Sequence, residues 1–158
     1  MATWSDVEAS APQFARRVKE SFDAYTNKTM ATLRRDGSPR ISGTEVEFVG
    51  GELWLGAMWQ SRKALDLQRD PRCAVHCGTG NGGESWTGDA KLSGTAVEIT
   101  DPVRHKEISE ASAGEAPPGP SHLFRLDINE VVHTRVEDNR LVIELWREGG
   151  GLRRLERQ

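Results

Sequence analysis

The chain has 158 residues, a length typical of one domain with a core of ordinary size. Its formal net charge of −3 gives no general reason to expect nucleic acid or an anionic membrane as a partner. No apolar run approaches the roughly 20 residues of a membrane span, and the N-terminus lacks a basic region followed by an apolar one. We therefore expect a cytoplasmic protein that binds neither nucleic acid nor membrane.

The first part of the chain predicts one helix and then three strands. Residues 11–25 favour an amphipathic helix, because Phe14, Val18 and Phe22 recur at helical spacing. The letters "DGSP" and "VGGE" are typical of turns that join hairpin strands. The predicted strands are 29–35, 40–48 and 53–58. Three strands joined by tight turns predict an antiparallel meander.

The second part alternates short helices, strands and loops. Asp101 and Pro102 are typical of a helix start, and 113–120 is a loop rich in Pro and Gly. The predicted helices are 61–69 and 101–112, and the predicted strands are 72–77, 86–99, 122–136 and 140–146. About seven strands, with no repeated βαβ spacing, predict a mainly β protein: an antiparallel, closed or nearly closed β-barrel with peripheral helices.

The chain is expected to divide into three parts. Residues 1–24 form an N-terminal helical segment, 25–147 the β-barrel domain, and 148–158 a C-terminal tail. The tail is most simply a frayed end, with Arg153 and Arg154 as candidate anion contacts.

Two cysteines, Cys73 and Cys77, suggest either a disulfide or a zinc site. On one strand they lie roughly 13 Å apart at ~3.3 Å per residue, beyond the limit of about 7 Å for a bridge. His76 points away from both sulfurs on such a strand, and no fourth ligand is near in sequence. We expect buried, inert thiols and no metal.

The strand 40–48 is polar at its beginning and apolar at its end. Alternation places Arg40, Ser42 and Thr44 on the same face as Val46 and Phe48. Two interpretations remain open: the strand emerges from the core into solvent, or the three polar residues line a ligand site.

The next strand carries a glycine at its centre. Trp54, Gly56 and Met58 share one apolar face, and the other face is apolar too, so both are expected to be covered. A mid-strand Gly often marks close approach of a ligand or another backbone. A flat aromatic ring along residues 56–58 would use that gap, whereas packing against the barrel wall is the alternative.

The helix at 61–69 begins with Ser61, Arg62 and Lys63. Free N–H groups at a helix start carry partial positive charge, so each exposed cation there costs up to about 1 kcal/mol. A bound anion removes this conflict, since Ser61 is a suitable N-cap and the two cations match phosphate oxygens. The alternative is two solvated cations. A ring site next to an anion site is what a mononucleotide-like cofactor requires.

The long strand 86–99 has small residues on one face, including Gly88, Ala90, Gly94 and Ala96. Small residues let another surface approach closely, which makes this face a candidate subunit interface. An ordinary half-exposed strand is the alternative.

The three histidines other than His76 do not indicate a hydrolase. His105 lies on a polar helix, His122 beside a loop and His133 on a strand with Arg135. None has an evident nucleophile or carboxylate partner in the sequence, so a Ser-His-Asp arrangement is not predicted.

Over roughly residues 25–147 the chain resembles the pyridoxamine-phosphate-oxidase-like family of flavin and deazaflavin proteins. The resemblance rests on "TLRRDGSPRIS", "GELWLGAM", "SRKALDLQRDPRCAV", "GDAKLSGTAVE" and the closing hairpin. It implies a split β-barrel and a homodimer with two cofactor sites at the subunit interface. The C-terminus departs from the substrate-binding tail of true pyridoxamine-phosphate oxidases, because "LRRL" is too short a match. Vitamin B6 oxidation is therefore not expected.

The same resemblance assigns a cofactor site to this sequence. The phosphate position falls on Lys63, with Ser61 and Arg62 beside it, and the ring contacts fall on 40–44 and 56–58. The candidate cofactor-binding residues are Arg40, Ser42, Gly43, Thr44, Gly56, Ala57, Met58, Ser61, Arg62 and Lys63.

We therefore predict an oxidoreductase that passes hydride between FMN and a small organic substrate, in which the cofactor supplies the chemistry and no catalytic acid or base is named. The family also contains reductases that use the deazaflavin coenzyme F420, which is the alternative cofactor. Its longer anionic tail needs a basic track, for which the candidates are Arg16, Arg17, Lys19, Arg34, Arg35 and Arg40. The competing hypothesis is a non-catalytic flavin- or ligand-binding protein of the same fold.

Overall fold

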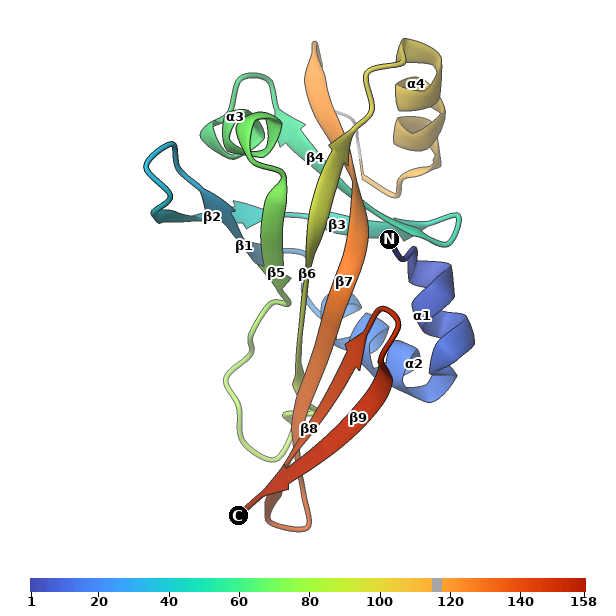
Figure 1. Cartoon of the computed structure of the whole chain (residues 1–158), viewed down its shortest axis with the longest axis vertical. Coiled ribbons are helices and arrows are strands. Elements are labelled where there is room, and N and C mark those ends of the chain that lie inside the picture. Colours follow the sequence, from blue (N-terminus) through green and yellow to red (C-terminus); the bar gives the residue numbers. More distant parts are fainter. Residues whose placement is uncertain (115–117) are drawn as a thin grey trace.

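The computed structural model describes residues 1–114 and 118–158 (Figure 1). Within these ranges the helices are α1 (Trp4–Ser10), α2 (Pro12–Asp23), α3 (Arg62–Arg69) and α4 (Pro102–Ala111). The strands are β1 (Lys28–Leu33), β2 (Pro39–Thr44), β3 (Val46–Val49), β4 (Glu52–Met58), β5 (Arg72–His76), β6 (Asp89–Glu98), β7 (Ser121–Glu137), β8 (Arg140–Arg147) and β9 (Gly151–Arg157). None of the described helices is long and apolar enough to cross a bilayer.

All nine strands belong to one sheet in which every pairing is antiparallel. The order is β2-β1-β5-β6-β7-β4-β3, with β8 on β7 and β9 on β8. The 17-residue β7 makes this possible, because its first part pairs with β4 and its second part with β8. The predicted mainly β, antiparallel fold is confirmed.

The segment 40–48, predicted as one strand, is divided at Glu45 into β2 and β3. β2 pairs with β1, whereas β3 pairs with β4 and lies at the opposite end of the strand order. The chain thus joins the two edges of the sheet covalently, which curls the sheet without hydrogen bonds between its two end strands. The predicted meander is therefore right in its two hairpins, β1–β2 and β3–β4, and wrong in its single middle strand, because β4 pairs with β3 and β7 and not with β2.

The main core lies between the sheet and the first two helices. α2 buries Phe14, Val18 and Phe22, as its spacing predicted. The segment 1–24 was expected to be helical, but α1 was not predicted as a separate helix. Thr3 and Asp6 form a capping box at its start: the Thr3 side chain accepts from the Asp6 amide, and Asp6 accepts from the Thr3 amide.

The small residues of β6 are used inside the chain and do not form the predicted subunit interface. Ala90 and Ala96 are buried, and α2 packs against this strand. A Cβ on Gly94 would lie 2.0 Å from the carbonyl oxygen of Asp127, where the β6–β7 register shifts. The strand begins at Asp89 rather than at Trp86.

The C-terminal tail is ordered, so the expectation of a frayed end is wrong. Residues 151–157 form β9 and pair with β8 along its length, from Leu141 opposite Arg157 to Arg147 opposite Gly151. β8 itself follows a tight turn at Asp138 and Asn139, which both have positive φ as a type I′ hairpin turn requires.

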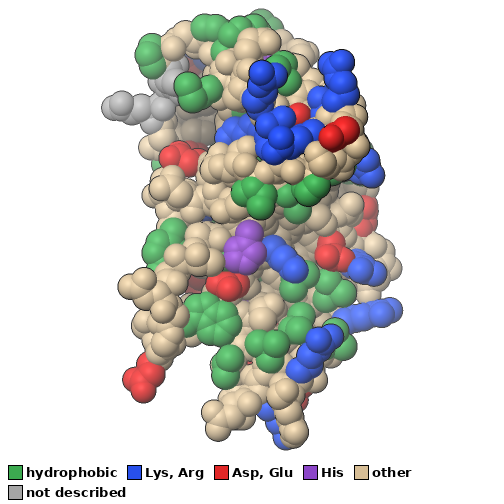
Figure 2. Space-filling view, turned by 90° about the vertical axis from the view of Figure 1, so that its left-hand side faces the viewer, with side chains coloured by type: hydrophobic (Ala, Val, Ile, Leu, Met, Phe, Trp, Pro, Cys, Tyr) green, Lys and Arg blue, Asp and Glu red, His purple; other side chains and the backbone are tan. Residues whose placement is uncertain are grey.

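The face of β7–β9 turned away from α1 and α2 is partly apolar. Leu141, Ile143 and Leu145 are half-buried there, and Leu155, opposite Ile143, is exposed. Figure 2 shows hydrophobic side chains gathered in the lower half of the molecule, where β7, β8 and β9 lie in Figure 1. The described residues leave this strip open to solvent.

Both cysteines are free and buried, as predicted. Burial raises the pKa of the Cys73 thiol to about 12. Burial also raises the pKa of Cys77. Neither sulfur is therefore a ready thiolate at neutral pH.

Candidate functional site

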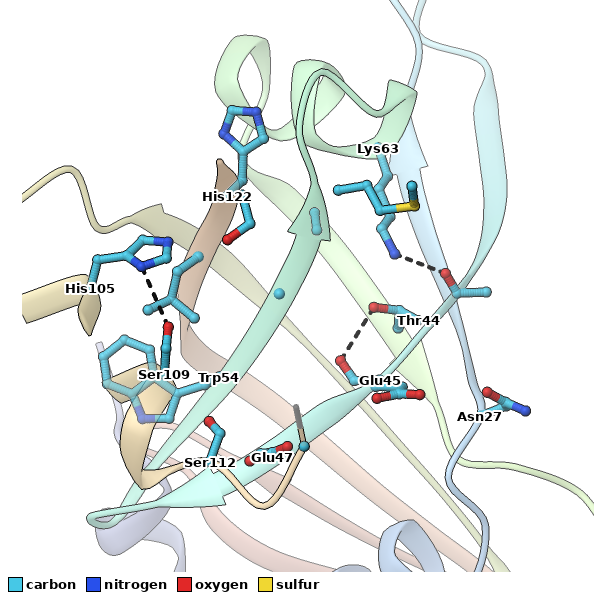
Figure 3. Close-up of a pocket in the computed structure, with 17 residues that line it drawn as sticks. Asn27, Thr44, Glu45, Glu47, Trp54, Lys63, His105, Ser109, Ser112 and His122 are labelled. Atoms are coloured by element: carbon cyan, nitrogen blue, oxygen red, sulfur yellow. Dashed lines mark hydrogen bonds between the residues drawn. The ribbon is translucent and has the colours of Figure 1, made fainter. Parts of the chain in front are cut away.

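A cavity of about 440 Å³ lies beside the ends of β2 and β4 (Figure 3). Its walls come from β2, β4 and the start of α3 on one side, and from β3, α4 and β7 on the other. Ligand pockets in proteins usually enclose about 300–1,000 Å³. Of the predicted cofactor residues, the cavity brings together Gly43, Thr44, Gly56, Ala57, Met58 and Lys63. Arg40, Ser42, Ser61 and Arg62 are not among its lining residues.

Arg40 is held by a carboxylate and does not reach the cavity. Its Nε donates to Oδ2 of Asp66 on α3 at 2.7 Å, and Thr32 donates to the same oxygen at 2.8 Å. Arg69 donates to the other oxygen at 3.1 Å. Burial opposes the ionisation of Asp66, but these hydrogen bonds outweigh it and lower its pKa. The ion pair between Arg40 and Asp66 therefore joins β2 to α3.

The three residues at the start of α3 are in different environments. Lys63 is half-buried and its Nζ donates to the carbonyl oxygen of Gly43 at 2.9 Å, while Arg62 is exposed. Burial lowers the pKa of Lys63, although the negative charge of Glu45 works against this shift. Ser61 occupies the N-cap position, yet its side chain makes no cap hydrogen bond and its buried Oγ has no partner in the described chain. Lys63 is thus a sheltered cation, whereas Arg62 is solvated.

The end of β4 supplies an open edge to the cavity. Gly56 is exposed, and a Cβ placed on it would meet no atom within 4 Å. The next residue, Ala57, is buried, and Met58 is 76% exposed. The expectation that both faces of this strand are covered holds for Leu53, Trp54 and Leu55 but not for Gly56 and Met58. This edge can accept a flat group without rearrangement.

The opposite wall of the cavity is built on α4. This helix buries only Ile108, which packs with Trp54 and Leu123 in a small cluster separate from the main core. His105 and Ser109 face the cavity from α4, and Nδ1 of His105 lies 3.4 Å from the Ser109 hydroxyl. Nε2 of His105 is buried without a hydrogen-bond partner in the described chain.

Glu47 of β3 completes this wall. Its Oε2 accepts a hydrogen bond from the amide of Ala113, just after α4, at 3.1 Å. Ser112 lines the same part of the cavity and donates its hydroxyl hydrogen to the carbonyl oxygen of Ile108 at 3.1 Å. The cavity therefore has a cationic end at Lys63 and an end with carboxylate, hydroxyl and imidazole groups at α4.

His122 has a carboxylate partner, which corrects the expectation drawn from the sequence. Its Nδ1 lies 2.6 Å from Oε1 of Glu98, and its Nε2 accepts from the amide of Gln60 at 3.2 Å. The ring stacks on exposed Trp59 with centroids 4.6 Å apart. In Figure 3 the ring points away from the cavity, so His122 contributes its backbone to the wall.

The site residues that the sequence did not indicate come mainly from β3, α4 and β7. His105 and Ser109 are far from residues 56–63 in sequence, and only the folded sheet brings them together, whereas Glu47 lies on β3, the strand that directly precedes β4. The spacing of His105 and Ser109 places two polar residues on one face of α4, and Ser112 follows as the C-cap residue. That polar face was the available signal.

The fold and the cavity together define a split β-barrel protein with a site for a small ligand. The family model described as pyridoxamine 5'-phosphate oxidase matches residues 16–135. The chain therefore belongs to the pyridoxamine 5'-phosphate oxidase family, and the resemblance seen in its motifs is confirmed. A comparison with curated proteins finds no match.

Several solved structures share this fold. A pyridoxamine 5'-phosphate oxidase-related, FMN binding protein from Nostoc punctiforme has a TM-score of 0.64 at 14% identity, covering 100% of this chain and 98% of that one. PhzG from Burkholderia lata, in complex with tetrahydrophenazine-1-carboxylic acid, has a TM-score of 0.60 at 16% identity, covering 94% and 87%. An F420 reductase has a TM-score of 0.53 at 15% identity, covering 71% and 94%. At these identities the likeness establishes the split-barrel fold.

Proposed function

We propose that the chain binds FMN in the cavity and acts as an oxidoreductase that passes hydride between the flavin and a small organic substrate. The observation that carries this proposal is the sheltered amine of Lys63 at one end of the open edge Gly56–Met58. A cation beside a surface that accepts a flat ring suits a phosphate-bearing aromatic cofactor. Membership of the family and the FMN-binding structural relative support the same cofactor.

The residues present fit such a cofactor. Lys63 has no carboxylate within the distance of an ion pair among the described residues, and Ser61 has a free hydroxyl on the same helix turn. Lys63 would hold the phosphate, and Gly56, Ala57 and Met58 would lie along the ring. The bound flavin would supply the hydride chemistry. The chain would bind and orient it, while Trp54 and Leu123 would keep water from the α4 side.

The deazaflavin F420 is the alternative cofactor, since one structural relative is an F420 reductase. Several cations of the basic track that its tail needs already form ion pairs within the chain. Arg17 is paired with Glu144, and Lys19 with Asp23. Arg40 is tied to Asp66, so the remaining cations of the proposed track are Arg16, Arg34 and Arg35, which are exposed. These pairings favour FMN.

We also propose that the protein is a homodimer, although not through the small-residue face of β6. The half-buried strip of Leu141, Ile143 and Leu145 on the sheet face away from α1 offers an apolar surface for a second copy. Exposed Ile41 on β2 and Met58 at the end of β4 add further apolar surface. Two-fold pairing is the commonest arrangement of soluble oligomers. Light scattering at micromolar concentration should give about twice 17.5 kDa, and the monomer mass would contradict the dimer.

The decisive experiment for the cofactor is a visible spectrum of the purified protein, followed by parallel titrations with FMN and F420 at two salt concentrations. We expect FMN to bind more tightly and with the weaker salt dependence. Tighter and more salt-sensitive F420 binding would reverse the choice, because a tail on exposed cations is screened by salt. Failure to bind either compound would contradict the proposed function. Binding without reduction of the flavin in the presence of reductants and substrates would favour a carrier protein.

A further inference from the structure

The α4 end of the cavity has an unusual polarity for the inner side of a helix. We define the α4 wall as Glu47, His105, Ser109 and Ser112. His105 and Ser109 are four residues apart on one face of α4, Ser112 is the C-cap residue directly after the helix, and Figure 3 shows all three on the cavity side. A helix that faces the protein interior is ordinarily apolar on that side. The polar face of α4 therefore calls for a role other than packing.

His105 gives independent evidence that this wall is incomplete. Its Nδ1 lies 3.4 Å from the Ser109 hydroxyl, and its buried Nε2 has no partner in the described chain. In one tautomer Nε2 carries a hydrogen with no acceptor, and in the other it presents a lone pair with no donor. Buried polar atoms are paired in most proteins, so an unpaired one next to a cavity suggests a missing ligand group.

Electrostatics decides which kind of group fits. Glu47 accepts one hydrogen bond from the Ala113 amide, and no described residue forms an ion pair with it. Glu45 also lines the cavity, whereas Lys63 is the only Lys or Arg among the described lining residues. A carboxylate or phosphate at the α4 wall would meet Glu47 without a cation to neutralise it. A hydroxyl or amine could instead donate a hydrogen bond to the carboxylate of Glu47 or to the unpaired nitrogen of His105.

We infer that the α4 wall selects the substrate, and that it takes a neutral or cationic group carrying a hydroxyl or amine in preference to an anion. This inference rests on the proposed function, in which Lys63 is occupied by the cofactor phosphate and the α4 end is left for the substrate. The Lys63 end of the cavity would then hold the anionic phosphate of the cofactor, and the α4 end a neutral or cationic group of the substrate.

Three probes of similar size test the inference: benzylamine, benzyl alcohol and benzoate. Their binding is measured by ligand-observed saturation-transfer NMR, first on the protein alone and then after saturation with FMN. We expect benzylamine and benzyl alcohol to bind about tenfold more tightly than benzoate, the difference that one hydrogen bond to a charged group makes. Glu47→Gln should remove most of the preference for benzylamine over benzoate. Equal binding of all three probes, or no binding at millimolar concentration, would overturn the inference.

Two further variants separate recognition from structure. His105→Phe keeps an aromatic ring and removes the unpaired nitrogen, so the thermal midpoint should not fall while benzyl alcohol binding weakens. A lower midpoint with unchanged probe binding would show a structural role and overturn the inference for His105. Glu110→Gln, on the exposed side of α4 near Lys106, is the matched control and should change nothing.

The FMN titration keeps the two proposals distinguishable. If FMN does not bind but the probes show the expected preference, the proposed function fails and the selectivity of the α4 wall stands. If FMN binds and Glu47→Gln leaves the probe preference unchanged, only the inference about the α4 wall fails.

Discussion

The two helices that flank the cavity are held in opposite ways. α3 is fixed by the buried Asp66, which joins it to Arg40 of β2, and by Leu67 in the main core. α4 buries Ile108 alone, in a small cluster with Trp54. Both helices carry residues of the same cavity, so one end of the site is anchored by charge and packing, and the other by a few apolar contacts.

This difference matches the tasks that we propose for the two ends. A phosphate site needs its cation at a fixed position, because charge-assisted hydrogen bonds depend on geometry. A substrate site benefits from a wall that can adjust to its ligand, and elements with few buried contacts are the ones that open at low free-energy cost. The following predictions test the contrast between α3 and α4.

The largest effect is expected from Asp66→Ala. Arg40 and Arg69 would lose their carboxylate, and removing one partner of a buried ion pair costs about 3–5 kcal/mol. Urea unfolding measures the loss. Asp70→Ala removes the carboxylate of an ion pair with Arg72, a side chain that is 73% exposed, and is the matched control with little expected change. Equal stability of the two variants would show that α3 is not held by its buried charge.

Ile108→Ala should loosen α4 without unfolding the barrel. Truncation of a buried Ile costs about 2–5 kcal/mol, and the small size of this cluster places the effect near the lower limit. Hydrogen exchange should show faster exchange in α4 and unchanged protection in β5, β6 and β7. The control is Val103→Ala, an exposed position on the same helix. Loss of protection across the whole sheet would contradict a separately anchored α4.

Lys63→Ala should weaken FMN binding by about 1.5–3 kcal/mol, the range for a hydrogen bond to a charged group. Folding should change little, because the start of α3 loses a cation that opposes the helix dipole. Equilibrium titration followed by flavin fluorescence measures the affinity. Lys106→Ala on the exposed side of α4 is the control. An unchanged FMN affinity would remove Lys63 from the proposed phosphate site.

The smallest effect is the pH dependence that Asp66 itself contributes to the stability of the fold. The pKa of Asp66 is lowered in the folded chain, so its stabilising charge is fully present above the ordinary value of 3.8 and is lost as the pH falls through the lower folded pKa. The free energies of unfolding of the wild type and of Asp66→Asn, both measured in urea, should therefore converge as the pH falls below about 4. A difference that stays constant down to strongly acidic pH would contradict this assignment.

The sequence by itself determined the local features of this protein. Periodicity located α2, turn residues located the hairpins β1–β2 and β3–β4, and the motif at 61–63 marked the start of α3. These features depend on neighbours within a few residues, so their signal is contained in short stretches. The same motifs indicated the family and, through Gly43, Gly56 and Lys63, part of the cavity wall.

The tertiary structure decided how these pieces meet. The division of 40–48 into two strands, the pairing of β9 and the tie between Arg40 and Asp66 each depend on a partner that periodicity does not identify. The α4 wall is the clearest case, because His105 reaches the cavity only when β7 places α4 beside β4. Contacts between distant segments form through the packing of the whole sheet, and no single stretch of sequence encodes them.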